Sequence, residues 1–323
     1  MNTGMAANMG DGFVSVAGNP APDDANCGYL EISARVKVRY GLFPAQGDAR
    51  GTVCFLQGRG ECMERNFESI RDLTQRGYQV AALDWRGQGG SPAAARANRH
   101  GHVSSFVHYL SDFNRFMTEV VLPDCPPPYI LLGNSMGGHI GLRLVSRHNW
   151  FAAAVMVAPL IDIPNTHLPR WFKLVVVKAM TWVGLGRLKL PFHVSRLPRQ
   201  EDFDKSQLTS DRTRFMRNMR LWQEAPQLSA IAPTVGWVNA ALNSCRKLRS
   251  LNDTTPLRCP ALLVIAGQDK VVSNEAIQQF ARFVPGAVTV SINGAKHDIL
   301  AESDTFRDQF FAAFDAFVAD NIN

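Results

Sequence analysis

The sequence predicts an α/β fold in which a mostly parallel sheet is flanked by helices and interrupted by an inserted helical cap. Short runs that are apolar on both faces alternate with helical segments, which is typical of a parallel sheet buried under helices. The alternation stops near residue 159 and returns near residue 234. Because the later strands must complete the same sheet, we expect a core of residues 29–159 and 234–323 with a cap at 160–233.

The expected elements follow one another along the chain. Alternating polar and apolar residues predict an antiparallel hairpin at a sheet edge over residues 29–43. Buried strands are then expected at 52–56, 78–85, 129–132 and 152–157, with helices at 63–76, 103–122 and 136–148. After the cap, strands at 261–266 and 287–292 enclose a helix at 274–283, and a helix at 304–319 follows.

The N-terminus and the cysteines indicate a cytoplasmic protein. Residues 1–28 lack the basic start and apolar run of a signal peptide, so we expect a poorly ordered leader. No run of eighteen uncharged apolar residues predicts a membrane span. The cysteines show no paired or zinc-type spacing and are expected to be reduced; they are Cys27, Cys54, Cys62, Cys125, Cys245 and Cys259.

The positive charge is concentrated in the predicted cap. The whole chain carries a net charge of +6, whereas residues 164–220 hold twelve Lys or Arg and four Asp or Glu, a local surplus of +8. No nucleic-acid-binding motif accompanies this surplus. An anionic membrane surface or an anionic substrate is therefore a better partner than nucleic acid.

A serine stands between a predicted strand and a predicted helix, in Gly133-Asn134-Ser135-Met136-Gly137. Glycines two residues before and after a serine are typical of a nucleophile elbow, where the chain turns too sharply for side chains at those positions. Such a motif alone is weak. Its position directly after a buried strand makes Ser135 a candidate nucleophile.

Two further loops supply the groups that a serine nucleophile needs. Asp269 and His297 follow the last two predicted strands, and the carboxyl ends of parallel strands share one edge of a sheet. An imidazole can take the serine proton and return it to the leaving group, while a carboxylate orients the imidazole. Asp162 is the main rival acid, and His139 is expected to pack rather than to act.

An oxyanion hole requires two backbone N–H groups near the nucleophile. We expect the amide of Met136, which directly follows Ser135, and the amide of Arg59, in the loop after the strand at 52–56. The chemistry requires no metal or cofactor.

At these residues the chain resembles the α/β-hydrolase superfamily, and within it the bacterial lysophospholipase and monoacylglycerol lipase group. The matching stretches are residues 57–61, 83–91, 133–138, 267–269 and 294–297, with 208–215 and 233–237 in and beside the cap. The resemblance implies an α/β-hydrolase fold, a triad of Ser135, Asp269 and His297, and hydrolysis of carboxylic esters. It also implies a structural salt bridge involving Asp84 and Arg86.

The chain departs from the family pattern at two positions. The family often has histidine where this chain has Gln57 and Asn134. Neither change removes a catalytic group, so both are expected to alter the substrate pocket. Trp171 and Phe172 in the cap are further pocket candidates.

The cap contains a predicted helix at 169–184 with a basic side and an apolar side. Two interpretations are open. The favoured one is a lid helix packed on the core, and the other is a face that docks on anionic lipid and admits an acyl chain.

Together these features predict a serine ester hydrolase for lipid-like monoacyl substrates. The alternatives are a short-chain carboxylesterase, another hydrolase of the fold such as a proline iminopeptidase, and a non-catalytic binding module. An iminopeptidase needs acidic groups in the cap to hold a substrate ammonium, whereas this cap is basic. The oligomeric state is left open.

Overall fold

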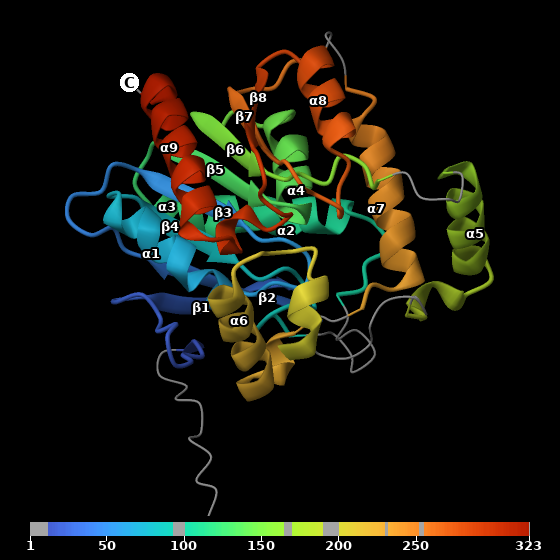
Figure 1. The fold of residues 1–323 in the computed structure, drawn as a ribbon, viewed down its shortest axis with the longest axis horizontal. Helices are drawn as coiled ribbons and strands as arrows, with labels where there is room; N and C mark the ends of the chain where they lie inside the picture. Colours follow the sequence, from blue (N-terminus) through green and yellow to red (C-terminus); the bar gives the residue numbers. More distant parts are fainter. Residues whose placement is uncertain are drawn as a thin grey trace, which may run out of the picture.

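The computed structural model describes residues 12–92, 101–164, 170–189, 200–229, 232–251 and 255–322, with side chains of the 170–182 helix described from residue 175 onward. An eight-stranded sheet crosses the molecule in the order β1-β2-β4-β3-β5-β6-β7-β8 (Figure 1). The strands are β1 Asn26–Ser33, β2 Val36–Phe43, β3 Thr52–Leu56, β4 Gln79–Leu83, β5 Tyr129–Asn134, β6 Ala153–Val157, β7 Ala261–Ala266 and β8 Ala287–Ile292.

The predicted sheet is confirmed. The hairpin β1–β2 pairs antiparallel to β4 at one edge, and the pairs from β4 through β8 are parallel. All five residues of β3 and all six of β7 are buried, as expected for strands covered on both faces. The carboxyl ends of β3, β5, β7 and β8 therefore meet at one edge of the sheet.

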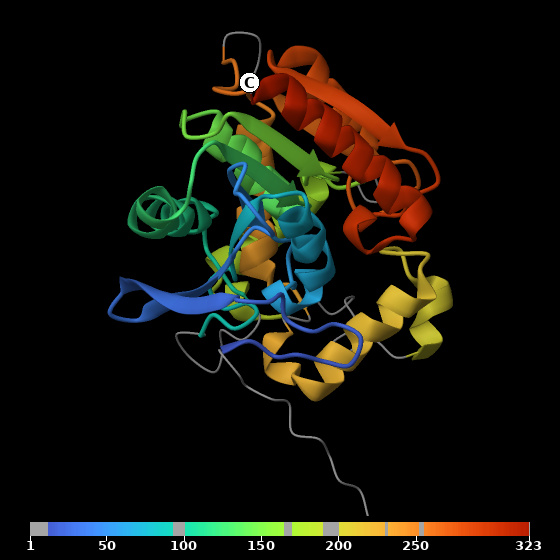
Figure 2. The same cartoon turned by 90° about the vertical axis from the view of Figure 1, so that its left-hand side faces the viewer.

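Helices cover both faces of the sheet (Figures 1 and 2). One face packs against α2 Val107–Phe116, α4 Met136–Val145, α7 Val235–Leu248 and α8 Asn274–Phe283. The other packs against α1 Phe67–Gln75 and α9 Asp304–Asn321. Shorter helical segments are η2 Met63–Asn66, η4 Met117–Val121, α3 Leu122–Asp124 and η8 Ile299–Ala301.

The cap lies between β6 and α7. Its described helices are α5 Arg170–Trp182, η5 Leu185–Arg187, η6 Gln200–Lys205, α6 Arg212–Glu224 and η7 Pro226–Leu228. Helix α6 lies beside η2 and the N-terminal segment, whereas α5 lies on the outer side of α7 (Figures 1 and 2). The cap thus touches the core through two different helices.

The expected leader is shorter than the sequence indicates. Phe13, Val14 and Val16 are at most 5% exposed, and β1 already begins at Asn26. Phe13 packs on Phe43 and Phe67 in the main core, so residues 12–28 belong to the folded domain. The isolated apolar residues in this polar stretch are fixed by tertiary contacts that local composition does not reveal. Residues 1–11 lie outside the described part.

Two further expectations concern the whole chain. None of the six cysteines, all of which are described, forms a disulfide. Among the described residues, no helix is both long and apolar enough to cross a membrane.

Candidate active site

Ser135 occupies a strained corner between β5 and α4. Its φ of 51° and ψ of −109° lie where residues with a side chain are rarely found. A Cβ on Gly133 would stand 2.8 Å from the backbone of Gly137 and Gly138, so only glycine permits this crossing. The corner leaves Ser135 partly exposed between fully buried neighbours.

Ser135, His297 and Asp269 form one hydrogen-bonded chain. The Ser135 Oγ lies 3.0 Å from His297 Nε2, and His297 Nδ1 lies 2.7 Å from Asp269 Oδ2. Since a carboxylate only accepts, Nδ1 carries a proton and Nε2 is left to accept the serine proton. The three loops that the sequence singles out are thus brought together in the arrangement that proton transfer requires.

The Asp269 carboxylate is held by its own loop. Its side chain is completely buried, and Oδ1 accepts hydrogen bonds from the amides of Val271 and Val272 at 2.7 and 3.0 Å. These bonds leave Oδ2 directed at His297. The rival acid, Asp162, forms an ion pair with Arg249 instead, at 2.7 Å.

The loop after β3 lies directly against the start of α4. A Cβ on Gly137 would stand 2.0 Å from the Leu56 carbonyl oxygen and 2.7 Å from that of Gln57, so the two backbones touch. Gly58 likewise allows close approach to Glu61 and Asn134. This packing places the loop that carries Arg59 beside the Ser135–Met136 peptide.

The Arg59 side chain is directed onto an aromatic ring. Its guanidinium lies 4.8 Å from the ring centroid of Trp237, at the start of α7. Burial lowers the pKa of Arg59 to about 10, a change that the nearby Tyr109 partly opposes. The guanidinium therefore joins the loop after β3 to the helix that returns from the cap.

Gln57 and Asn134, which were expected to shape the pocket, instead support the loop from beneath. Both are 1% exposed. The Gln57 amide donates to Leu83 O and Asp84 Oδ1, each at 2.9 Å. Asn134 donates to Glu61 Oε1 at 2.8 Å. The side chains of Trp171 and Phe172 lie outside the described ones.

A buried ionic network joins the loop after β3 to the His297 loop. Arg65 pairs with Glu61 at 3.0 Å and also contacts Asp298, the residue after His297. Burial raises the pKa of Glu61, although Arg65 partly opposes this change. Because Glu61 also accepts a hydrogen bond from Asn134, the network connects the residue before Ser135 with the residue after His297.

The sequence did not identify this network, although Arg65 stands four residues after Glu61. That spacing is the one available signal, since the contact with Asp298 spans 233 positions. Asp84 and Arg86 do form structural salt bridges, but with different partners: Asp84 pairs with Arg39 at 2.6 Å, and Arg86 pairs with Asp112.

His139 is a packed residue, as expected. It is completely buried and lies edge-on to Phe106. Its Nδ1 donates to Leu160 O at 2.7 Å, and its Nε2 accepts from Ser244 Oγ at 2.6 Å. Burial lowers the pKa of His139 to about 3, so the ring is neutral, and both of its nitrogens are bonded within the packed core.

The fold and this constellation define an α/β hydrolase with a serine, histidine and aspartate site. Residues 47–304 match the profile of the family described as "Serine aminopeptidase, S33", and the chain belongs to this family.

Relatives and solved structures agree with the assignment. Lysophospholipase L2 of Escherichia coli strain K12 is 28% identical, with 84% of this chain and 81% of the relative covered. The probable lysophospholipase L2 of Haemophilus influenzae is 26% identical, with 86% and 87% covered. A soluble variant of Saccharomyces cerevisiae monoglyceride lipase shares the fold, with a TM-score of 0.73, 18% identity, and 92% and 96% covered.

Proposed function

We propose that this protein is a serine carboxylic-ester hydrolase acting on monoacyl lipid esters. The observation that carries the proposal is the continuous hydrogen-bonded chain from Ser135 through His297 to Asp269, with the serine at a strained turn. Backbone strain of this kind is retained where the surrounding structure enforces it, and it leaves the hydroxyl accessible to substrate.

In the proposed reaction, Ser135 Oγ attacks the ester carbonyl while His297 Nε2 takes its proton. The amides of Met136 and Arg59 stabilise the developing oxyanion. His297 then protonates the departing alcohol, leaving an acyl group on Ser135. Water, deprotonated by His297, releases the fatty acid and restores the serine, with Asp269 orienting the imidazole throughout.

The names of the relatives favour a lipid substrate. The two bacterial relatives are named lysophospholipase L2 and probable lysophospholipase L2, and the yeast structure is a variant of monoglyceride lipase. The family description names an aminopeptidase, which would need a carboxylate for the substrate ammonium. Among the cap acids, Asp211 is already paired with Arg214 and caps α6, and the basic surplus of the cap as a whole favours the ester hydrolase.

Helix α5 supports a second proposal, that the cap docks on anionic membranes. Val175 and Trp182 of this helix are 57% and 87% exposed, and Val183, which directly follows it, is 59% exposed, although the sequence favours a lid helix with its apolar side buried. Val177 is buried, and the helix packs along α7. An exposed apolar side next to basic residues such as Lys178 is suited to a lipid interface.

The test is a series of p-nitrophenyl esters of increasing chain length, alongside a lysophospholipid and a monoacylglycerol. We expect hydrolysis of the lipid substrates, labelling of Ser135 by a fluorophosphonate, and a loss of kcat of about 10⁴- to 10⁶-fold in Ser135→Ala. Activity on short esters alone would make the protein a short-chain carboxylesterase. Hydrolysis that survives in Ser135→Ala would contradict the mechanism.

A further inference from the structure

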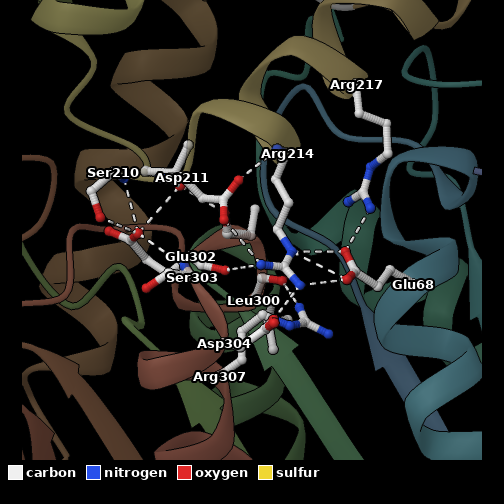
Figure 3. Close-up of polar contacts among 12 residues, drawn as sticks. Glu68, Ser210, Asp211, Arg214, Arg217, Leu300, Glu302, Ser303, Asp304 and Arg307 are labelled. Carbon is white, nitrogen blue, oxygen red and sulfur yellow. Dashed lines mark hydrogen bonds and ion pairs between the residues drawn. The ribbon is translucent and has the colours of Figure 1, made fainter. Parts of the chain in front are cut away.

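Glu302 lies five residues after His297 and is completely buried, yet the mechanism above does not use it. A buried carboxylate is costly unless hydrogen bonds compensate it, and its donors must then stay in place. The donors to Glu302 come from two parts of the molecule. One is the loop that carries His297, and the other is the cap, whose Ser210 lies beside Glu302 in Figure 3.

The first oxygen of Glu302 closes the His297 loop upon itself. Oε1 accepts a hydrogen bond from the amide of Lys296 at 2.9 Å. Lys296 directly precedes His297, so the backbone on one side of the catalytic imidazole is tied to the residue that ends the loop. Displacement of this loop would alter the distances from His297 to Ser135 and Asp269.

The second oxygen of Glu302 holds the cap. Oε2 accepts from the Ser210 hydroxyl at 2.6 Å and from the Ser210 amide at 2.9 Å. Beside it, Thr209 Oγ1 donates to Ala301 O at 2.7 Å. We call residues 206–211 the cap strap, because this segment crosses from η6 to α6 over the His297 loop.

The cap strap also contacts the His297 loop directly. The amide of Asp298 donates to Leu208 O at 2.8 Å, and that of His297 to Gln207 O at 3.4 Å. Lys296 Nζ donates to Ser206 O at 2.8 Å. The three consecutive residues of the loop thus all have partners in the strap.

A second contact fixes the far end of the strap. Arg214 on α6 donates to Glu302 O at 2.9 Å and pairs with Glu68 of α1 at 2.6 Å (Figure 3). Arg217 pairs with Glu68 at 2.6 Å as well. Glu68 therefore attaches the same cap helix to the core without touching the His297 loop.

From this arrangement we infer that Glu302 is the positioning residue that couples the cap strap to His297. One carboxylate spans the two segments, so the strap must be docked for the loop to hold the imidazole between Ser135 and Asp269. The inference rests on the proposed function and adds a residue whose part in catalysis is to fix the geometry. It also gives a role to the 208–215 stretch.

The test compares Glu302→Gln with Glu68→Gln, which makes the same change at another carboxylate between cap and core. In Glu302→Gln one carboxylate oxygen is replaced by an amide NH2 group, which donates and cannot accept a hydrogen bond. The side chain can therefore no longer accept from both the Lys296 amide and Ser210. We expect kcat on a soluble p-nitrophenyl ester to fall about 10- to 100-fold with little change in KM. Glu68→Gln is expected to keep kcat within about twofold and to lose only stability.

A second readout does not depend on turnover. We expect the proton between His297 Nδ1 and Asp269 to give a far-downfield resonance in the NMR spectrum of the wild type, and this resonance to shift or broaden in Glu302→Gln and to remain in Glu68→Gln. If the wild type hydrolyses no ester, the proposed function fails, and this resonance still decides the inference. Unchanged kcat and resonance in Glu302→Gln would overturn it, as would equal losses in both variants.

Should Glu302→Gln fail to fold, Ser210→Ala provides the decision. Ser210 is an exposed strap residue, and the substitution removes one donor to Glu302 while Lys296 stays bonded. A loss of kcat smaller than the one expected for Glu302→Gln, with unchanged KM and a shifted His297 resonance, would support the coupling. Wild-type values for both would refute it.

Discussion

Helices α5 and α6 belong to the same cap but are held in opposite ways. Helix α6 is fixed by charges: Arg214 and Arg217 pair with Glu68 of α1, and their side chains are 12% and 13% exposed. Helix α5 packs along α7 and leaves Trp182 87% exposed. One helix is fixed to the core by ion pairs, whereas the other presents an apolar surface.

The difference between the two helices shows which positive charges of the cap are available to a membrane. The local surplus of +8 suggests one positive surface, yet two of the four arginines of α6, Arg214 and Arg217, are paired with acids of the core, Glu68 and Asp304. Charge that is paired in this way stabilises the docked cap and is not available to an anionic membrane. The membrane proposal therefore rests on α5, which adds exposed apolar side chains to the basic cap.

The largest effect is expected from Arg214→Met, which would release α6. The substitution leaves Glu68 with one partner and removes the bond to Glu302 O, so we expect a loss of about 3 kcal/mol in the free energy of unfolding. Urea denaturation measures it. Arg220→Met is the control, because Arg220 is exposed and makes a 3.3 Å bond to Ala17 O. Equal losses would contradict the distinction between these arginines.

A smaller effect, on binding rather than folding, is expected from Trp182→Ser combined with Val183→Ser. Both side chains are exposed, so stability should stay within about 0.5 kcal/mol. Binding to anionic vesicles should weaken by about 2 kcal/mol, or roughly 30-fold.

Cosedimentation with vesicles measures this change, and Phe283→Ser on α8 is the matched control because it also removes an exposed apolar side chain. Hydrolysis of a soluble ester should be unchanged in all variants. If the double variant binds vesicles as well as the wild type, α5 is not the membrane surface.

The sequence predicts a structural feature well when the residues that determine it are close together along the chain. The bounds of β3, β7, β8 and α8 agree with the expected ranges, because local apolar runs and caps determine them; Ser273, for example, caps α8. The positions of Ser135, Asp269 and His297 were predictable because strand ends of a parallel sheet converge.

The supporting contacts could not be predicted in the same way. Glu302 reaches Ser210 across 92 positions, and Arg65 reaches Asp298 across 233. A sequence shows that these residues are charged or polar, but many pairings satisfy the same composition. The same limit explains Phe13 and Val14, whose burial depends on partners that lie far along the chain.

The smallest expected effect is a pH dependence of the free energy of unfolding, which we expect from the ion pairs of α6 and not from α5. Burial alone would raise the pKa of Glu68, but the hydrogen bonds from Arg214 and the charges of Arg307 and Arg217 lower it to about 2, from an ordinary value of 4.5. Ionised Glu68 therefore stabilises the fold fully above pH 4.5, and this contribution is lost as the pH falls toward 2.

The relevant quantity is the difference in unfolding free energy between the wild type and Glu68→Gln. Because Glu68 is partly in contact with water, we expect this difference to shrink by only about 1 kcal/mol between pH 6 and pH 3. The α5 double variant lacks any change in titrating groups, so its stability should follow the wild type over the same range. A constant difference for Glu68→Gln would mean that the ion pairs of α6 do not hold the cap in solution.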